Sequence, residues 1–380
     1  MEYDVYVGCY TGRDGGEGIY QLRLDTEKKT LKKVNVFRGK EPSAEGNLKD
    51  DFWKKQKEGK EACKENAPCF SNPSFLVVTD TNVYAVSEEE EGKGGITAWQ
   101  RDAESGSLKY LNHLRVSGTA MCHLCLWPDG KHLSAANYTS GSLAVCSILE
   151  DGSLGEVCDT KQHTGVGFDK EDRQKGPHVH STTVSADGQY LYVADLGLDQ
   201  IFCYKIEEKG HLKLAEEERQ IHTLAGSGPR HFCFTQNGKY LYVATEMGNK
   251  LCIYEKQEDG VYQGLQQESM LDKDFQKHSQ GADIHISDSG RFLYVSNRGE
   301  NTIAVFEVSP EDGRVKAVGR ADCGGDWPRN FCLTPEDDFL LIANQYSGDI
   351  TLLEVNKQTG LPGKCLVQVK IPAASFVTVL

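Results

Sequence analysis

The stretches LYVADL at residues 191–196, LYVATE at 241–246 and LYVSNR at 293–298 are three copies of one six-residue unit. The other copies are VYVGCY at residues 5–10, VYAVSE at 83–88, LSAANY at 133–138 and LLIANQ at 340–345. The seven copies start at residues 5, 83, 133, 191, 241, 293 and 340, so successive starts lie 78, 50, 58, 50, 52 and 47 residues apart. A period near 50 residues, built from short β-type runs and turns, is typical of a four-stranded β-propeller blade. The repeat therefore predicts seven blades.

The two ends of the chain predict how the ring closes. The chain begins directly on a repeat unit (VYVGCY), with no first strand before it, and ASFVTVL at residues 374–380 follows the last unit as an orphan strand. Pairing these two ends would complete the first blade and remove exposed sheet edges. We therefore expect an all-β, seven-bladed propeller of four-stranded antiparallel blades. It would span residues 1–380 as one domain, closed by its C-terminal strand.

A charged insertion accounts for the long first interval. Residues 39–70, approximately, are rich in Lys and Glu and poor in apolar residues. Such a composition does not bury enough apolar surface to form a core. We expect the insertion to decorate the surface as a loop or a short helix.

Composition limits the partners and the compartment. The net charge of −14 argues against nucleic acid and anionic membrane surfaces, which require basic patches. An anionic small substrate would then need local arginines. The N-terminus lacks the pattern of a secretory signal, and no apolar run approaches a membrane span. The 13 irregularly spaced cysteines indicate free thiols in a reducing cytoplasm. No oligomeric state is predicted.

The expected site lies where first strands begin and second strands end, because both surround the same mouth of the ring. First strands begin at GPHVHS, GPRHFC and DWPRNF, and second strands end at the fifth and sixth positions of the repeat. The residues expected to crowd this mouth are His178, His180, Arg230, Glu246, Arg298 and Arg329. Bases, acids and guanidinium groups in one place suit an anion-binding catalytic site. Further candidates for substrate contact are Arg173 and Gln174, just before the histidines, and Asp195 and Asn344 at fifth positions.

Several interpretations of His178 and His180 remain open. Side chains alternate along a strand, so both histidines would face the same side. Metal binding, catalysis, hydrogen bonding and a plain structural role are all compatible with that placement. A third and a fourth metal ligand are not evident, so we expect no metal and no other cofactor.

The ordered motifs YVGCYTG, NPSFL, ANYTSGS, RQKGPHVHS, VADLGLDQI, GPRHF, SNRGENTI and WPRNF resemble the seven-bladed propeller lactonase family. That family includes bacterial propeller-type 6-phosphogluconolactonases and the fungal carboxy-cis,cis-muconate lactonizing enzyme. The resemblance covers nearly the whole chain outside the charged insertion. It implies an active-site histidine, two arginines and a glutamate. These would fall on His178 or His180, Arg230, Arg298 and Glu246. The start TAMCHL in the third unit departs from the proline-led pattern, which leaves His123 without an assigned role.

The leading functional hypothesis is metal-independent hydrolysis of a sugar lactone, namely 6-phosphogluconolactone in the pentose phosphate pathway. Arg230, Arg298 and Arg329 would hold the phosphate and stabilise the oxyanion, and Glu246 or a histidine would accept the proton from water. A second hypothesis is cyclisation of a carboxylated muconate, which needs proton delivery to carbon. A third is a protein-binding scaffold, although the repeats lack the Gly-His and Trp-Asp marks of common scaffolding propellers.

Overall fold

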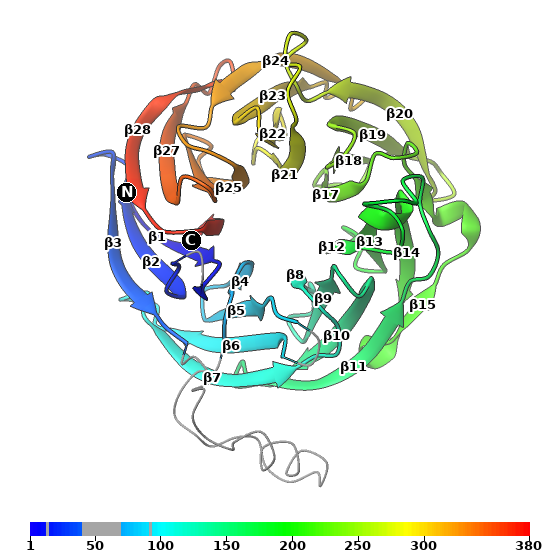
Figure 1. Cartoon of the computed structure of the whole chain (residues 1–380), viewed down its shortest axis with the longest axis horizontal. Coiled ribbons are helices and arrows are strands. Elements are labelled where there is room, and N and C mark those ends of the chain that lie inside the picture. The colour runs from blue at the N-terminus through cyan, green and yellow to red at the C-terminus, as the bar shows by residue number, and fades with distance from the viewer. Residues whose placement is uncertain (13–14, 40–69, 91–92) are drawn as a thin grey trace, which may run out of the picture.

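Seven antiparallel sheets surround a common axis in the computed structural model, which describes residues 1–12, 15–39, 70–90 and 93–380 (Figure 1). Each sheet is one blade. The insertion expected at residues 39–70 lies, apart from its two end residues, outside the described residues.

The blades follow one another around the ring, and we number them in that order. Written from the inner to the outer strand, blade 1 is β29(Ala374–Val379)-β1(Glu2–Cys9)-β2(Ile19–Asp25)-β3(Thr30–Phe37), and blade 2 is β4(Leu76–Val78)-β5(Asn82–Ser87)-β6(Gly95–Arg101)-β7(Leu108–Arg115). Blade 3 is β8(Met121–Leu126)-β9(His132–Asn137)-β10(Ser142–Ile148)-β11(Leu154–Gln162). Blade 4 is β12(Val179–Val184)-β13(Tyr190–Asp195)-β14(Gln200–Ile206)-β15(Leu212–Leu214), and β16(Ile221–His222) also pairs with β14. Blades 5 to 7 are β17(Pro229–Phe234)-β18(Tyr240–Thr245)-β19(Lys250–Lys256)-β20(Tyr262–Ser269), β21(Gln280–Ile286)-β22(Phe292–Arg298)-β23(Thr302–Val308)-β24(Val315–Asp322), and β25(Pro328–Leu333)-β26(Phe339–Asn344)-β27(Asp349–Val355)-β28(Pro362–Lys370). Three short 3-10 helices accompany blade 4: η2(Leu196–Leu198), η3(Glu208–Gly210) and η4(Glu217–Arg219).

The C-terminal strand closes the ring, as the sequence predicts. Strand β29 pairs antiparallel with β1, from Val5 opposite Val379 to Cys9 opposite Ala374. Figure 1 shows this strand, in red, lying on the inner side of the blue N-terminal blade. Two segments from opposite ends of the sequence thus form one sheet, and the edge of β1 is covered.

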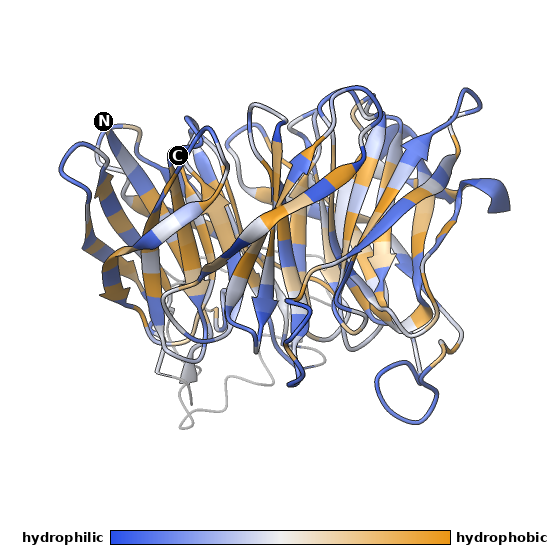
Figure 2. Cartoon of the chain, turned by 90° about the horizontal axis from the view of Figure 1, so that it is seen from above, coloured by the Kyte–Doolittle hydropathy of each residue, from blue (hydrophilic) through white to orange (hydrophobic). Residues whose placement is uncertain are grey.

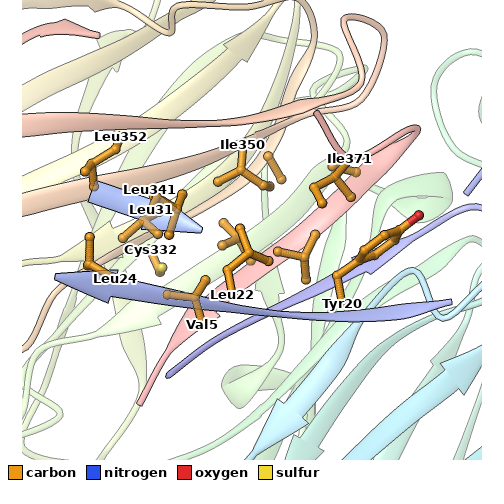
Figure 3. Close-up of a cluster of buried hydrophobic side chains, with 14 of the residues drawn as sticks. Val5, Tyr20, Leu22, Leu24, Leu31, Cys332, Leu341, Ile350, Leu352 and Ile371 are labelled. Atoms are coloured by element: carbon orange, nitrogen blue, oxygen red, sulfur yellow. The ribbon is translucent and has the colours of Figure 1, made fainter. Parts of the chain in front are cut away.

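Apolar side chains hold neighbouring blades together. The described residues form seven buried hydrophobic clusters, and each cluster combines side chains from two adjacent blades. The cluster between blades 1 and 7 includes Leu22, Leu341 and Leu352 (Figure 3). Full burial of one such side chain stabilises the fold by about 1.5–3 kcal/mol before entropy costs. Figure 2 shows hydrophobic residues along the strands and mostly hydrophilic residues in the connecting loops.

The tyrosine of the repeat adds a polar tie between blades. In four second strands its hydroxyl donates a hydrogen bond to a glycine carbonyl in the outer hairpin of the next blade. The pairs are Tyr6–Gly106 at 2.6 Å, Tyr84–Gly152 at 3.0 Å, Tyr242–Gly313 at 2.9 Å and Tyr294–Gly360 at 2.9 Å. A buried phenol needs such a partner. The repeated Tyr therefore connects neighbouring blades, in addition to favouring a β-strand.

Two further sequence expectations concern cysteines and membranes. The eleven cysteines among the described residues are free. Within the same part of the chain, no helix is long and apolar enough to cross a membrane.

Deletion of the last eight residues is expected to abolish cooperative unfolding. Without β29, β1 would become the innermost strand of blade 1, and its unpaired edge would be exposed to solvent and to other chains. Thermal melting followed by circular dichroism, with light scattering for aggregation, measures the effect. A truncated chain that melts like the full-length protein and stays monodisperse would contradict closure by β29.

Candidate active site

A shared irregularity at the start of the inner strands supplies one half of the site. In five inner strands the pairing with the second strand skips one residue. The skipped residues are Cys122 in β8, His180 in β12, Arg230 in β17, Arg329 in β25 and Ser375 in β29. A β-bulge of this kind bends the strand and redirects the extra side chain. Equivalent positions in five blades thus present different chemical groups at one end of the ring.

The residues that follow the second strands supply the other half. These residues occupy the sixth position of the repeat and meet the bulged residues of the inner strands. The contacts are Glu246 Oε2 to Arg230 Nε at 3.2 Å, Tyr10 Oη accepting from Arg329 at 2.8 Å, and the Tyr138 ring edge-on to His180 with centroids 5.5 Å apart. The predicted convergence of strand starts and strand ends is therefore present in the structure.

Glu246 is surrounded by three guanidinium groups, and we call these four residues the arginine cluster. Its Oε1 accepts a 2.6 Å hydrogen bond from Arg173, and its Oε2 accepts one of 2.7 Å from Arg298 and lies 3.2 Å from Arg230 Nε. Burial alone would raise the pKa of Glu246, but the three positive charges reverse this and hold that pKa well below its usual value. Glu246 is thus a firmly ionised anchor and a weak base.

Backbone carbonyls of blade 6 fix two of these arginines. Arg298 Nη2 donates to the carbonyl of Gly281 at 2.8 Å, and Arg230 Nη1 donates to that of Ala282 at 2.7 Å. Both carbonyls lie where the β21–β22 register is irregular. A Cβ on Gly281 would stand 2.4 Å from the carbonyl oxygen of Thr245, so only glycine fits there. Arg230 Nη2 and Arg298 Nη1 have no acceptor among the described residues and are not enclosed, so they remain available to a ligand.

A second hydrogen-bonded group contains Arg329 and Glu88. Arg329 donates to the Tyr10 hydroxyl, which in turn donates to Glu88 Oε2 at 2.9 Å. Ser74 Oγ donates to the same carboxylate oxygen. Burial lowers the pKa of Arg329, but Tyr10, Glu88 and Glu246 more than offset this effect, so the net shift is upward. This group lies close enough to the arginine cluster for the charges to interact.

The site carries more positive than negative charge. Arg173, Arg230, Arg298 and Arg329 contribute +4, and Glu88 and Glu246 contribute −2, so these side chains sum to +2 in a chain of net charge −14. Burial, followed by repulsion from Arg298 and Arg329, lowers the pKa of Arg230 to about 9. The local excess of positive charge is the reversal of field that an anionic substrate requires.

The two histidines occupy different environments, although the sequence places both on one side of a strand. His178 precedes β12, stacks on Tyr138 with centroids 4.5 Å apart, and donates from Nδ1 to the Tyr138 carbonyl. His180 is the bulged residue and is 4% exposed. Burial and the charges of Arg230 and other neighbours hold the pKa of His180 well below 6.5, so its imidazole is neutral. The bulge breaks the strict alternation on which the prediction relied.

Three predicted contact residues lie away from the site. Asp195 and Asn344 are fully buried fifth-position residues, and side chains at fifth and sixth positions face opposite ways. Asp195 accepts from the His178 backbone and from His163, while Asn344 donates to Asp349. We assign neither residue a contact with substrate.

Gln174 is the third of these residues, and both ends of its side-chain amide are hydrogen-bonded within the protein. Its Oε1 accepts from Asp169 N, and its Nε2 donates to the Leu196 carbonyl. Gln174 therefore holds together the loop that carries Arg173. Arg173 itself reaches the site and is the most exposed member of the arginine cluster, with 31% of its side chain accessible.

A buried polar layer beneath the site was not predicted. His231 donates to Asp283 at 2.7 Å, and Asn330 and His285 also hydrogen-bond to that carboxylate. His123 packs against His231 with ring centroids 5.3 Å apart. In β8, β17 and β25 the residue after the bulge belongs to this layer, so only knowledge of the bulges would have revealed it from the sequence.

Comparison with known proteins assigns this fold and site to a class. The family model for "Lactonase, 7-bladed beta-propeller" matches residues 51–379. The chain therefore belongs to the family of seven-bladed β-propeller lactonases, as the motif resemblance predicts. As a member of that family it is an enzyme of the carboxylic ester hydrolase class.

Individual relatives narrow the comparison. The chain is 36% identical to the 6-phosphogluconolactonase of Bacillus subtilis, over 94% of this chain and 93% of that protein. It is 34% identical to the 6-phosphogluconolactonase of Formosa agariphila, with the same coverage. The solved structure of the periplasmic gluconolactonase of Pseudomonas aeruginosa superimposes with a TM-score of 0.85 at 29% identity, over 100% of this chain and 99% of that chain.

Glu246→Gln is expected to lower the free energy of unfolding by about 3 kcal/mol at pH 7, because three buried or half-buried guanidiniums lose their counter-charge. A carboxyl group with a lowered folded-state pKa stabilises the fold above its unfolded pKa, near 4.5, and this contribution disappears as the pH falls through the folded value. The difference between the two proteins should therefore shrink below about pH 4.5. Urea unfolding at several pH values measures it.

Glu217→Gln is the matched control for this prediction. Glu217 is 78% exposed and, among the described residues, forms an ion pair with His222 alone, so its substitution should leave stability unchanged. Equal stability of wild type and Glu246→Gln at pH 7 would contradict the anchoring role of Glu246.

Proposed function

We propose that this lactonase hydrolyses 6-phosphogluconolactone to 6-phosphogluconate, a step of the pentose phosphate pathway. The observation that carries the proposal is the charge of +2 summed over the four arginines and two glutamates of the site. A phosphate monoester carries about −1.5 to −2 charges at neutral pH and complements that excess. An unphosphorylated gluconolactone has no charge to offer. The names of the two relatives at 34% and 36% identity agree with a phosphorylated substrate.

Each arginine has a role in this proposal. Three arginines have N–H donors without an acceptor among the described residues: Arg230 at Nη2, Arg298 at Nη1 and the half-buried Arg329. The paired N–H groups of a guanidinium suit phosphate and carbonyl oxygens. These groups would bind the phosphate and stabilise the oxyanion that forms when water adds to the lactone carbonyl. Glu246 would keep the guanidiniums oriented before substrate arrives, so the site needs little reorganisation during the reaction. Arg173, the most exposed arginine of the cluster, would cover the solvent-facing side of the bound substrate.

The histidines have supporting roles in the same scheme. His178 holds Tyr138, whose hydroxyl accepts a 3.1 Å hydrogen bond from Arg173. His180, kept neutral among the arginines, would offer a hydrogen bond to the substrate without adding charge. We also propose a cytoplasmic location, on the basis of the sequence's cysteine usage; the Pseudomonas relative is periplasmic by name.

Arg298→Ala is expected to weaken binding of 6-phosphogluconate by about 10- to 100-fold, the range that follows from losing a charge-assisted hydrogen bond. Isothermal titration calorimetry measures the affinity, and lactone hydrolysis is followed above a no-enzyme control. Arg314→Ala is the control, because Arg314 lies at the surface and pairs with Asp312. Undiminished product affinity in Arg298→Ala would contradict the phosphate assignment. Turnover of a carboxylated muconate without lactone hydrolysis would favour the cyclase alternative.

The reaction is also proposed to need no metal ion. In the part of the chain that the structure describes, no three His, Cys, Asp or Glu side chains gather in a way that would hold one. Hydrolysis should therefore proceed at an unchanged rate after dialysis against EDTA. Activity that disappears with EDTA and returns with one divalent cation would show that a metal takes part.

A further inference from the structure

Hydrolysis of a lactone requires a group that accepts a proton from the attacking water, and the arginine cluster does not supply a good one. Both oxygens of Glu246 are engaged by guanidinium groups, which favour its ionised form so strongly that it binds a proton poorly. General-base catalysis is efficient when the acceptor binds a proton near the working pH. Protonation of His180 would place a fourth positive charge beside three arginines, which opposes the transfer.

Glu88 offers a carboxylate in a different setting at the same site. Its Oε2 accepts hydrogen bonds from two neutral hydroxyl groups, those of Tyr10 and Ser74. Its Oε1 has no partner among the described residues and is not enclosed by protein atoms. In the part of the chain that the structure describes, no Lys, Arg or His lies within ion-pair distance of Glu88. One oxygen is therefore oriented by the protein and the other is free to face a water molecule.

The position of Glu88 relative to the arginines suits an attack on a bound carbonyl. Arg329 reaches Glu88 through the Tyr10 hydroxyl, without a direct contact. Burial raises the pKa of the Cys122 thiol, and the charges of Glu88, Arg230, Arg329 and Glu246 also act on it. The hydrogen-bonded chain from Arg329 through Tyr10 to Glu88 places this carboxylate near a guanidinium that could hold a carbonyl oxygen.

We propose that Glu88 is the general base of the hydrolysis, a role that rests on the proposed lactonase reaction. Glu88 Oε1 takes a proton from water as the water oxygen forms a bond to the lactone carbonyl carbon. The guanidiniums stabilise the resulting oxyanion. The ring C–O bond then breaks, and the proton passes from Glu88 to the departing alkoxide oxygen. One water is consumed and one hydroxy acid is formed, with no oxidant or other reactant.

The test compares turnover, product affinity and rescue in the full-length chain. Glu88→Gln keeps an acceptor for Tyr10 and Ser74 but removes the base, so kcat for 6-phosphogluconolactone should fall by about 100-fold or more. Affinity for 6-phosphogluconate and the melting temperature should stay close to wild type. Glu88→Ala should regain part of its lost rate as sodium formate is added, because a small carboxylate can replace the missing base. A merely structural role would not respond to formate.

Glu90→Gln provides the matched control, because Glu90 is 83% exposed and its one ion-pair partner in the described part of the chain is Lys93. The Glu90→Gln protein should hydrolyse the lactone at the wild-type rate, and added formate should not change that rate. Wild-type hydrolysis together with an equally active Glu88→Gln would overturn the role of Glu88 and leave the proposed function intact. So would a Glu88→Gln protein that loses product affinity in parallel with rate. A wild-type chain that hydrolyses no lactone would instead overturn the proposed function itself.

Discussion

Closure of the ring by β29 is the constraint on which the rest of this structure depends. A blade buries its two faces only against neighbours, so seven interfaces require a ring without a gap. The closing strand also reaches the centre of the molecule, because Val377 N donates to Asn330, and Asn330 donates to Asp283 beneath the site. A pairing between the two chain ends thus positions polar groups that lie far from both ends in the sequence.

The site arises where the repeat is imperfect. A bulge at the same place in five blades inserts one additional side chain, and the inserted residues are Cys122, His180, Arg230, Arg329 and Ser375. Each bulge shifts the register by one residue, and the inserted side chains gather at one end of the ring. There, buried guanidiniums find Glu246 and backbone carbonyls as partners.

The sequence was sufficient for the fold, and it also predicted which charged side chains gather at one mouth of the ring. Period, turn residues and the orphan C-terminal strand determine a closed ring, because each reflects a backbone requirement. Arg230, Glu246, Arg298 and Arg329 follow from strand ends that must converge. Asp195 and Asn344 are buried away from the arginine cluster because adjacent positions on a strand face opposite sides. The different environments of His178 and His180, and the polar layer beneath the site, depend on bulges that the residue pattern alone does not reveal.

Two carboxylates share this site, and their neighbours separate their chemistry. Guanidinium groups contact Glu246 directly, so its negative charge holds them in place, while Arg230 Nη2 and Arg298 Nη1 have no acceptor among the described residues. Hydroxyl groups contact Glu88, and the nearest arginine acts on it only through Tyr10. Two carboxylates can take different roles in one site when their surroundings differ, here an orienting role for Glu246 and the proposed base role for Glu88. The four arginines exceed the two carboxylates in charge, and this excess of positive charge is the reason for proposing a phosphorylated substrate.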